Sequence, residues 1–467
     1  MTNELSITKV IFMINTTMLG VGMYYTPYSF SQTGILNGCL ILGGVVILTI
    51  LSIFSLLYSS KEEEHRRERR KSIKLNTLEN AYHEVSTEIP IDDEDDTKEI
   101  EELSYADLGF SIRPVLVKII NTMITVSGVV SCLFYLKFIG EVGSTLSGYT
   151  KGDDMWYPIN IIFMYSLSIF LFLAAQVRDL SRFDKLATAN VGIIGIIGFC
   201  IFLFNFLFSG YKETHIANPN KGDLMFSITN FIFAMSCQVN VVKFYTDLKN
   251  KSFKSLALIS ILAPVTCAFL YGMVGIMGAS LLGDNWERGD VIMMFANANS
   301  PLRLYIAQAH PNFAFLFYLI PSMTMFSLMI GFIFQLSAVT RSVTRMRILR
   351  RLPDYQKVLI STGCSFAIIL LINSLPMLKL DFVFSLISNL ICNPIAFIFP
   401  FMFANHYFGS KYTTVRVVCI LSILASIVFA GTNTCFSILE LIYSSDYSIG
   451  TNSTEAPFLA ETTTTNN

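Results

Sequence analysis

Eleven long apolar segments follow one another along this chain, and they limit its possible folds more than any other feature. A helix needs roughly 20 apolar residues to cross the hydrocarbon of a bilayer, and a helix in lipid satisfies its own backbone groups. We therefore expect an all-α polytopic membrane protein with eleven transmembrane helices. The predicted spans are residues 6–30, 34–58, 115–146, 157–177, 186–209, 224–245, 255–282, 313–340, 356–377, 381–405 and 413–442.

Composition agrees with this prediction and excludes several kinds of protein. Of the 467 residues, 53% are hydrophobic and 14% charged, which is too apolar for a soluble chain of this length. The formal net charge of −1 gives no reason to expect a nucleic-acid partner. The nine cysteines make neither a CxxC pair nor a disulfide framework, so no metal cluster or other cofactor is predicted. The absence of HExxH and GxSxG motifs argues against an enzyme.

The distribution of Lys and Arg predicts the orientation. A cytoplasmic N-terminus puts 25 of these residues in cytoplasmic segments and 6 in outer ones, and basic residues favour the cytoplasmic side. Eleven spans then place the C-terminus on the extracellular or lumenal side, where Asn452 begins an N-glycosylation sequon. The predicted organisation is 1–58 (two transmembrane helices), 59–113 (charged cytoplasmic loop), 114–443 (helices three to eleven) and 444–467 (Thr-rich tail).

The loop at 59–113 is the one long soluble insertion. It opens with a basic block at 61–71 and closes with an acidic run over 92–102. Charge blocks of this kind are typical of solvated segments, so the loop is predicted to be largely disordered. Binding to anionic lipid, or to a cytoplasmic partner of unknown identity, is the alternative interpretation. Residues 103–113 are compatible with a short interfacial helix.

The first span contains two glycines and a proline, Gly20, Gly22 and Pro27. Gly costs about 1 kcal/mol and Pro about 3 kcal/mol in a helix interior. Broken backbone at membrane depth is tolerated only inside protein or beside a watery cavity. The stretch 15–27 is therefore interpreted as the unwound centre of a discontinuous helix, where a polar solute can bind. A kinked span whose glycines allow close helix packing is the alternative.

The sixth span carries a similar interruption, with small and polar residues over 233–240. Amides such as Gln238 and Asn240 are costly in lipid unless they have partners. A packed helix with an amide bonded to a neighbour would satisfy that requirement without any site. Interruptions in spans one and six, however, are what two inverted five-helix halves would show. The pair therefore favours a binding site at mid-membrane.

Few charged residues fall inside the spans. Lys137 and Glu141, one helical turn apart, are expected to pair near the outer surface. No carboxylate is predicted at mid-membrane, which argues against a proton relay. The hydroxyls of Thr324 and Ser327 in the eighth span can bond to their own helix or ligate a small cation, and both interpretations stay open. Two asparagines and a proline in 389–394 predict an irregular tenth span.

Several short motifs occur in a fixed order over residues 5–440. They are Gly20-Val21-Gly22, Pro27-Tyr28-Ser29-Phe30, Thr33-Gly34-Ile35, Ser127-Gly128, Ser131-Cys132-Leu133-Phe134-Tyr135-Leu136-Lys137, Arg178-Asp179-Leu180-Ser181-Arg182-Phe183, Phe233-Ala234-Met235-Ser236-Cys237-Gln238, Tyr245-Thr246-Asp247-Leu248-Lys249-Asn250 and Val339-Thr340-Arg341. Together they resemble the amino acid/auxin permease family, within the amino acid–polyamine–cation superfamily. The closest branch is that of the sodium-coupled neutral amino acid transporters. The 59–113 loop and the tail fall outside the resemblance.

The resemblance implies a LeuT-like fold, in which two inverted repeats of five helices are joined by one extra helix. It also implies alternating access around a central amino acid site. Half-helix N-termini would receive the substrate carboxylate, and unwound carbonyls its ammonium group or a sodium ion. The implied substrate-binding residues are Gly20, Val21, Gly22, Met23, Ala234, Met235, Ser236 and Cys237.

A candidate sodium site also follows from the resemblance. In sodium-coupled relatives an Asn of the first span and a Thr of the eighth contribute to it. The family's Asn lies four residues before the first glycine of the motif, which is Thr16 here, and Asn15 comes one residue earlier. A shift of one residue turns a helical side chain by about 100°. The candidate ligands are Asn15, Thr16, Thr324 and Ser327.

The leading hypothesis is a secondary active transporter of amino acids, neutral ones above all, with sodium symport as one means of coupling. Proton coupling and uncoupled exchange are alternatives. So is a transporter-like amino acid sensor that signals through the 59–113 loop. The plasma membrane and a lysosome- or vacuole-type membrane both fit the sequence.

Overall fold

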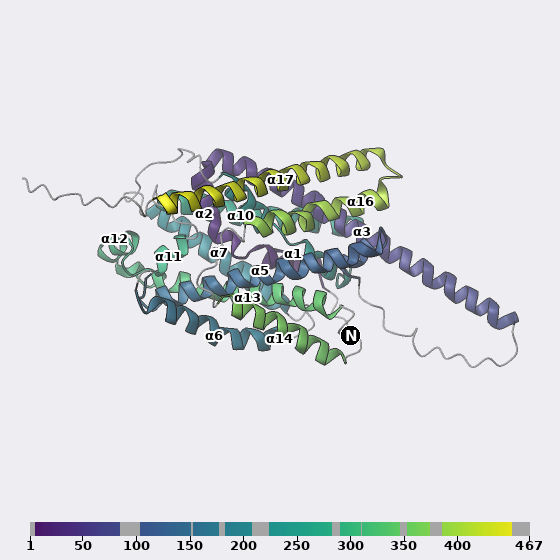
Figure 1. Ribbon diagram of the computed structural model, residues 1–467, viewed down its shortest axis with the longest axis horizontal. Helices are drawn as coiled ribbons and strands as arrows, with labels where there is room; N and C mark the ends of the chain where they lie inside the picture. The colour runs from purple at the N-terminus through teal and green to yellow at the C-terminus, as the bar shows by residue number, and fades with distance from the viewer. Residues whose placement is uncertain are drawn as a thin grey trace, which may run out of the picture.

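The computed structural model describes residues 5–84, 103–150, 153–176, 183–207, 224–282, 290–309, 311–345, 353–373 and 385–450. Figure 1 shows one elongated bundle whose long helices run roughly along a common axis. The short helices α11 and α12 lie at one end, and the last part of α3 projects from the other. We name these the α12 end and the α4 end, because α4 packs on α5 and α16 where α3 leaves the bundle.

The described residues form helices and connecting segments, with no β-strand among the elements of this part of the chain. The first part of the chain forms α1 (Ile7–Met18), α2 (Gly22–Thr33), α3 (Ile35–Glu84), α4 (Tyr105–Phe110), α5 (Pro114–Leu146), α6 (Trp156–Ala175), α7 (Asp184–Leu207), α8 (Leu224–Ala234) and α9 (Gln238–Thr246). The second part forms α10 (Phe253–Leu282), α11 (Asp290–Ala296), α12 (Pro301–Ala309), η3 (Pro311–Phe313), α13 (Leu316–Thr344), α14 (Asp354–Asn373), η5 (Ser388–Cys392), η6 (Pro394–Ile398), α16 (Phe399–Phe408) and α17 (Thr413–Gly450).

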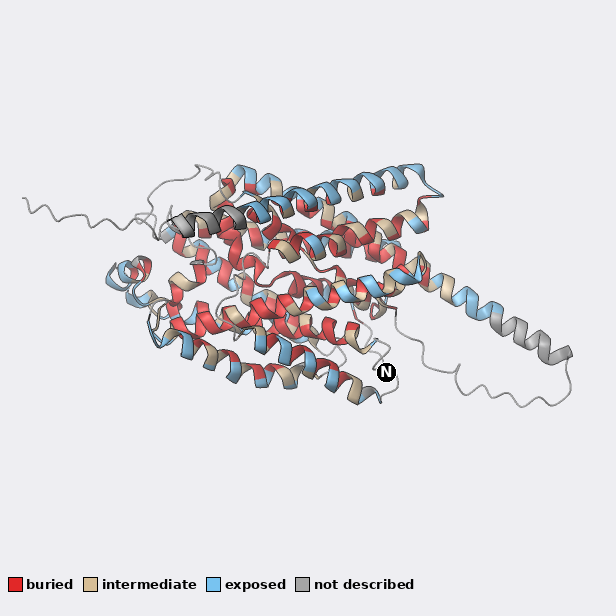
Figure 2. Ribbon diagram, in the orientation of Figure 1, coloured by how far each residue is buried: buried red, intermediate tan, exposed pale blue. Residues whose placement is uncertain are grey.

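A belt of apolar side chains covers the outside of the bundle, and Figure 2 shows the buried residues concentrated inside it. Leu36, Ile169, Phe269 and Leu421 are between 60% and 73% exposed. A soluble protein does not leave a continuous apolar surface of this kind in water. Ten of the described helical segments are long and apolar enough to cross a membrane, and the bent pair of α1 and α2 makes eleven. The predicted polytopic membrane fold is confirmed.

Two spans are interrupted where the sequence predicts it. Helices α1 and α2 meet at an angle of 64° across residues 19–21, and α8 and α9 are separated by residues 235–237. The interrupted spans are the first and the sixth, five apart, as two inverted halves require. The third and eighth spans, α5 and α13, pack along each other at the centre of the bundle. Leu19 and Val21 of the first break and Met235 and Cys237 of the second are buried, so both breaks lie inside protein, where unwound backbone is tolerated.

The second predicted span ends at residue 58, but its helix does not. Helix α3 continues to Glu84, through the basic block that was expected to be disordered. Arg66 pairs with Glu62 at 3.6 Å and Arg67 with Glu63 at 3.4 Å, each one turn along the helix. Pairs with the acid on the N-terminal side stabilise a helix. The insertion is therefore helical up to Glu84, and residues 85–102 lie outside the described residues.

The remaining local expectations are mostly confirmed. The short helix expected within 103–113 is α4, which begins with a reciprocal capping box between Ser104 and Asp107. The irregular tenth span contains the two π-helical turns η5 and η6 before α16. Such turns are rare in proteins, and those that occur are often found at functional sites. Lys137 and Glu141 lie 4.0 Å apart, as predicted, on the half of α5 nearer the α12 end.

Candidate functional site

The first break is short and tightly folded. Helix α1 ends with the Leu19 N–H donating to the Asn15 carbonyl at 2.7 Å. Helix α2 then begins with the N–H groups of Met23 and Tyr24 bonded to the Gly20 and Val21 carbonyls at 3.1 and 3.0 Å. The first N–H groups of a helix have no partner within it. The N–H groups of Val21 and Gly22, just before those two, are therefore the donors that the start of α2 presents to its surroundings, together with the positive end of a helix dipole.

Pro27 does not belong to this break, because it lies inside α2. A proline in a helix has no N–H for the carbonyl four residues earlier, which is that of Met23. The Thr26 hydroxyl donates to the Met23 carbonyl at 2.6 Å and satisfies it. Neighbouring Thr side chains commonly repair transmembrane helices in this way. The glycines alone therefore account for the break.

The second break is stabilised by an amide of its own. The Gln238 side chain accepts from the Cys237 N–H at 2.9 Å, at the start of α9. Its nitrogen donates to the Ser52 hydroxyl of α3 at 3.3 Å. Ser52 donates in turn to the carbonyl of Ala396 in η6. The costly amide is thus partnered, and it ties the second break to the second and tenth spans.

A cavity lies between the two breaks and the middle of α5. Its free volume, taken as the space open to the centre of a water molecule, is about 40 Å³. A water needs roughly 10–15 Å³ by this measure, so the cavity has room for a few waters. The lining residues are Thr17, Met18, Gly20, Val21, Gly22, Ser127, Ser131, Tyr135, Phe233, Ser236, Cys237, Gln238, Val239, Asn240, Gln335, Cys392 and Ile395. No Asp, Glu, Lys, Arg or His is among these described residues.

Most of the predicted substrate residues lie in this wall, and some do not. Five line the cavity: Gly20, Val21, Gly22, Ser236 and Cys237. The other three, Met23, Ala234 and Met235, are buried but do not line it. Ala234 is packed against the start of α2 instead. A Cβ added at Gly22 would lie 2.7 Å from the Ala234 Cβ and 2.8 Å from its Cα.

Tyr135 of α5 is a lining residue that the sequence analysis quoted only as part of a motif. It stands between two glycines of other helices. A Cβ added at Gly20 would lie 2.0 Å from its hydroxyl oxygen, and one at Gly331 of α13 would lie 2.6 Å from its ring. These glycines admit a large side chain to the first break. In the sequence, Tyr135 is visible only as part of the Ser131–Lys137 motif of the third span. That motif does not indicate which helices the tyrosine contacts.

The four candidate sodium ligands face different helices. Asn15 lies against α10, with its amide 3.2 Å from the Thr266 hydroxyl. The Thr16 hydroxyl donates to the Ala187 carbonyl of α7 at 3.0 Å. Each of the two is turned toward a separate neighbour, as the rotation of about 100° per residue requires. Helices α1 and α13 touch, but no hydrogen bond among the described residues joins Asn15 or Thr16 to the candidates on α13.

The other two candidates, Thr324 and Ser327, are buried on α13. The Thr324 hydroxyl donates to the Ile320 carbonyl of its own helix at 2.9 Å. The Tyr24 hydroxyl of α2 lies within electrostatic reach of both hydroxyls but makes no hydrogen bond of normal geometry. Buried hydroxyls of this kind usually find a partner. The hydroxyls of Tyr24, Thr324 and Ser327 therefore form a buried group between α2 and α13.

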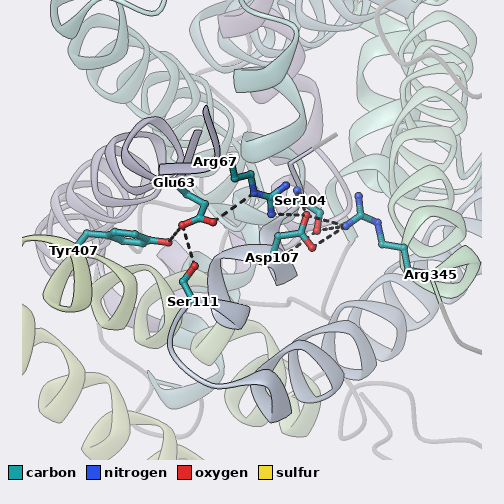
Figure 3. Close-up of polar contacts among 7 residues, drawn as sticks. All are labelled: Glu63, Arg67, Ser104, Asp107, Ser111, Arg345 and Tyr407. Atoms are coloured by element: carbon teal, nitrogen blue, oxygen red, sulfur yellow. Dashed lines mark hydrogen bonds and ion pairs between the residues drawn. The ribbon is translucent and has the colours of Figure 1, made fainter. Parts of the chain in front are cut away.

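A charged cluster lies at the α4 end of the bundle, as Figure 3 shows. We name it the α4 cluster; it comprises Glu63, Arg67, Ser104, Asp107, Ser111, Arg345 and Tyr407. Glu63, only 3% exposed, accepts from the Ser111 and Tyr407 hydroxyls at 2.9 and 2.8 Å. Arg67 bridges Glu63 to Asp107.

The α4 cluster also reaches the eighth span. Arg345, the residue that ends α13, lies 3.2 Å from both carboxylate oxygens of Asp107. One turn earlier on the same helix, Arg341 donates to the Asn240 side chain of α9 at 2.5 Å. Asn240 lines the cavity. Two arginines at the end of α13 thus make long-range contacts. Arg345 joins α13 to α4, at the end of the insertion, and Arg341 joins it to α9, which follows the second break.

Comparison with known proteins agrees with this architecture. The family described as "Transmembrane amino acid transporter protein" matches residues 90–446, which is more than half of the chain and includes the second break. Solute carrier family 38 member 8 from Homo sapiens is 23% identical over 175 residues, 34% of this chain and 39% of that protein. "Putative sodium-coupled neutral amino acid transporter 8" from Xenopus tropicalis is 18% identical over 314 residues, 63% of this chain and 62% of that protein. The chain thus spans less than two thirds of either relative.

Two solved structures share the fold along most of the chain. The crystal structure of MhsT in complex with L-phenylalanine has a TM-score of 0.60 at 10% identity, and the similarity covers 92% of this chain and 98% of MhsT. The manganese transporter of Eremococcus coleocola has a TM-score of 0.57 at 11% identity, with 95% and 91% covered. At these identities the similarity shows the fold alone, which is the predicted LeuT-like one.

The fold, the paired breaks and the family match agree with one another. The match covers most of the spans, and it describes a transporter rather than an enzyme. The protein is a multi-pass membrane protein that belongs to the transmembrane amino acid transporter family.

Proposed function

We propose that this protein carries small neutral amino acids across a membrane by alternating access. The observation that carries the proposal is the uncharged cavity bounded by both helix breaks. Every free α-amino acid carries a negative α-carboxylate and a positive α-ammonium group. A site built for the whole class therefore binds those two groups with backbone and leaves the side chain to decide specificity.

The chemistry of the cavity wall supports each part of this proposal. The start of α2, at Gly22, suits a carboxylate because free N–H groups and the positive helix dipole meet there. The carbonyls of the unwound residues suit an ammonium group. None of the described residues that line the cavity carries a charge that could pair with an acidic or basic substrate side chain. Room for a few waters favours a small side chain over a large one.

Sodium is the coupling ion that we propose first, with proton coupling and uncoupled exchange as alternatives. The hydroxyls of Thr324 and Ser327, together with the nearby Tyr24 hydroxyl, offer the oxygen ligands that a small hard cation prefers. We also propose that the α4 end faces the cytoplasm, because the excess of Lys and Arg is on that side. The host membrane is of the plasma membrane or the lysosome or vacuole type.

Uptake into proteoliposomes tests the transport proposal. Labelled L-alanine is supplied to vesicles that contain the purified protein, with sodium and pH gradients imposed separately. We expect uptake of L-alanine that unlabelled neutral amino acids inhibit and that L-lysine and L-glutamate do not. Stimulation by the sodium gradient would support sodium coupling, and stimulation by the pH gradient alone would replace it. If no amino acid enters under any gradient, the proposed function is wrong.

A transporter-like sensor is the second candidate, and the α4 cluster favours it. Both ends of the insertion, through Arg67 and Asp107, are joined to each other and to Arg345 at the end of α13. A partner bound to the insertion could therefore respond to movement of α13. Replacing residues 72–100 with a short Gly/Ser linker removes the insertion and keeps the cluster. Normal uptake with lost downstream signalling in cells would favour the sensor. If uptake and signalling both stay normal, the sensor is excluded.

A further inference from the structure

Tyr271 of α10 lies where both interrupted helices end. Its hydroxyl oxygen is 2.5 Å from the carbonyl oxygen of Met18, the last residue of α1. It is 2.9 Å from the carbonyl oxygen of Ala234, the last residue of α8. The backbone of Gly20 is also within electrostatic reach of the hydroxyl. A single buried side chain of a third helix therefore touches both breaks.

Such a meeting point is electrostatically unusual. The last carbonyls of a helix lack partners within it, and together they carry roughly half a negative charge. Two helix ends aimed at one place repel each other, and the repulsion is strong because the surroundings are buried and screen it weakly. Broken helices in transporters commonly place a monovalent cation against such ends. In this chain the phenolic hydrogen of Tyr271 occupies that place.

We propose that Tyr271 is a positioning residue whose hydroxyl replaces a monovalent cation between the two interrupted helices. The proposal rests on the proposed transport function and deepens it. The hydroxyl carries one hydrogen, which the Met18 and Ala234 carbonyls share. That shared hydrogen keeps the ends of α1 and α8 together while substrate binds and leaves. Any coupling ion must then bind elsewhere in the protein.

The same contact restricts how a substrate can bind. The Met18 and Ala234 carbonyls already have a donor, so the substrate ammonium is directed to other backbone oxygens of the cavity wall. The Phe233 carbonyl already accepts from the Ser236 N–H at 3.1 Å. Ser236, which lines the cavity beside the second break, has the backbone oxygen that remains for the ammonium group. Tyr271 itself does not line the cavity. Its effect on transport is therefore exerted through the two helix ends.

Tyr271→Phe tests the proposal because it removes the hydroxyl and keeps the ring. Both carbonyls then face each other without a donor, and we expect L-alanine uptake, measured at a sodium concentration that saturates the wild type, to fall about tenfold. More sodium, or added lithium, should restore a large part of this loss, because a small cation can enter between the carbonyls. The wild-type protein, already saturated with sodium, should not respond to the same addition. Cation-dependent recovery is a result that a purely structural role would not produce.

Tyr105→Phe is the matched control. Tyr105 is also buried, and its hydroxyl donates to the Ile395 carbonyl at 2.6 Å. The control loses a hydrogen bond of the same kind but touches neither break. Because Ile395 lines the cavity, the control is judged by its cation response alone, and we expect it to acquire no new cation dependence. Melting temperatures of both variants, measured in choline, sodium and lithium, give a second readout that needs no substrate.

The outcomes separate the proposal from the function on which it rests. Uptake by Tyr271→Phe that equals the wild type, or a loss that no cation repairs, overturns the proposal. A variant that folds only when sodium or lithium is present supports it, and one that fails to fold in every cation overturns it. If the wild-type protein takes up no amino acid, the proposed function fails. The cation dependence of the melting temperatures then still decides the role of Tyr271.

Discussion

At the scale of single residues, close approach explains the glycines of the first break. Tyr135 fills the space beside Gly20 and Gly331, and Ala234 fills the space beside Gly22. Neither contact requires an unusual backbone angle, because the described glycines with positive φ are elsewhere, at 34 and 148. The glycines thus allow three helices to meet around the cavity.

Gly22→Ala should damage transport by forcing two helices apart. The added Cβ would lie 2.8 Å from the Ala234 Cα, which is backbone and cannot rotate away. We expect uptake of L-alanine to fall at least about tenfold, since overpacking costs typically 1–3 kcal/mol. The same assay on Gly44→Ala is the control, because a Cβ there meets nothing within 4 Å. Equal uptake by the two variants would show that the close contact between α2 and α8 is not required for transport.

The sequence predicts the breaks but only part of the candidate site. Gly20 and Gly22 are visible because glycine pairs weaken a helix wherever it lies. The roles of Tyr135 and Tyr271 are not visible, since they depend on which helices pack together and which rotamers fit. Asn15 was proposed as a sodium ligand from a position in a motif. Its side chain lies against α10 because one residue of shift turns it by about 100°.

At the scale of elements, helix α3 is where prediction from composition failed. A dense block of charges was interpreted as disordered, whereas the spacing of its acids and bases forms i,i+4 pairs that stabilise a helix. The same helix buries Glu63 in the α4 cluster, where Arg67 and two hydroxyls satisfy it. Partners on α4 and α16 come from distant parts of the chain, and the sequence gives no sign of them.

Glu63→Gln should loosen the closure of the α4 end. Removing the charge weakens bonds to Arg67, Ser111 and Tyr407, and a hydrogen bond to a charged group contributes about 1.5–3 kcal/mol. Cys237 lines the cavity and reports its access to water-soluble thiol reagents once the other cysteines are replaced. We expect its modification from the α4 side to become about tenfold faster.

Glu62→Gln is the control for that measurement. Glu62 pairs with Arg66 on the same helix but is partly exposed, with a side chain 38% accessible. A partly exposed pair contributes little, so the modification rate of Cys237 should stay at the wild-type value. A faster rate in both variants would mean that helix stability, rather than the α4 cluster, limits access to the cavity.

At the scale of the whole molecule, the sequence alone was sufficient to predict the fold. Apolar length alone gives the spans, and two interrupted spans five apart give the inverted halves. Residue 452 lies outside the described residues, so the predicted glycosylation stays a prediction. The sequon at Asn15 is a useful contrast, because that residue is fully buried in the bundle.

Glycosylation of Asn452 tests the predicted topology. Protein expressed in a eukaryotic cell should shift to lower apparent mass when treated with an N-glycosidase, and Asn452→Gln should abolish that shift. Asn15→Gln should leave it unchanged. A wild-type protein with no glycan would remove the support for a lumenal C-terminus, and a shift that persists in Asn452→Gln would place the glycan elsewhere.

The central claim is that a small neutral amino acid binds in the cavity between the two breaks. Equilibrium binding of labelled L-alanine to the purified protein tests it, with Ser131→Leu measured beside the wild type. Ser131 lines the cavity from α5, and a leucine there would fill space sufficient for only a few waters. The account predicts saturable binding to the wild type and none to Ser131→Leu. Equal affinity in the two proteins would contradict it.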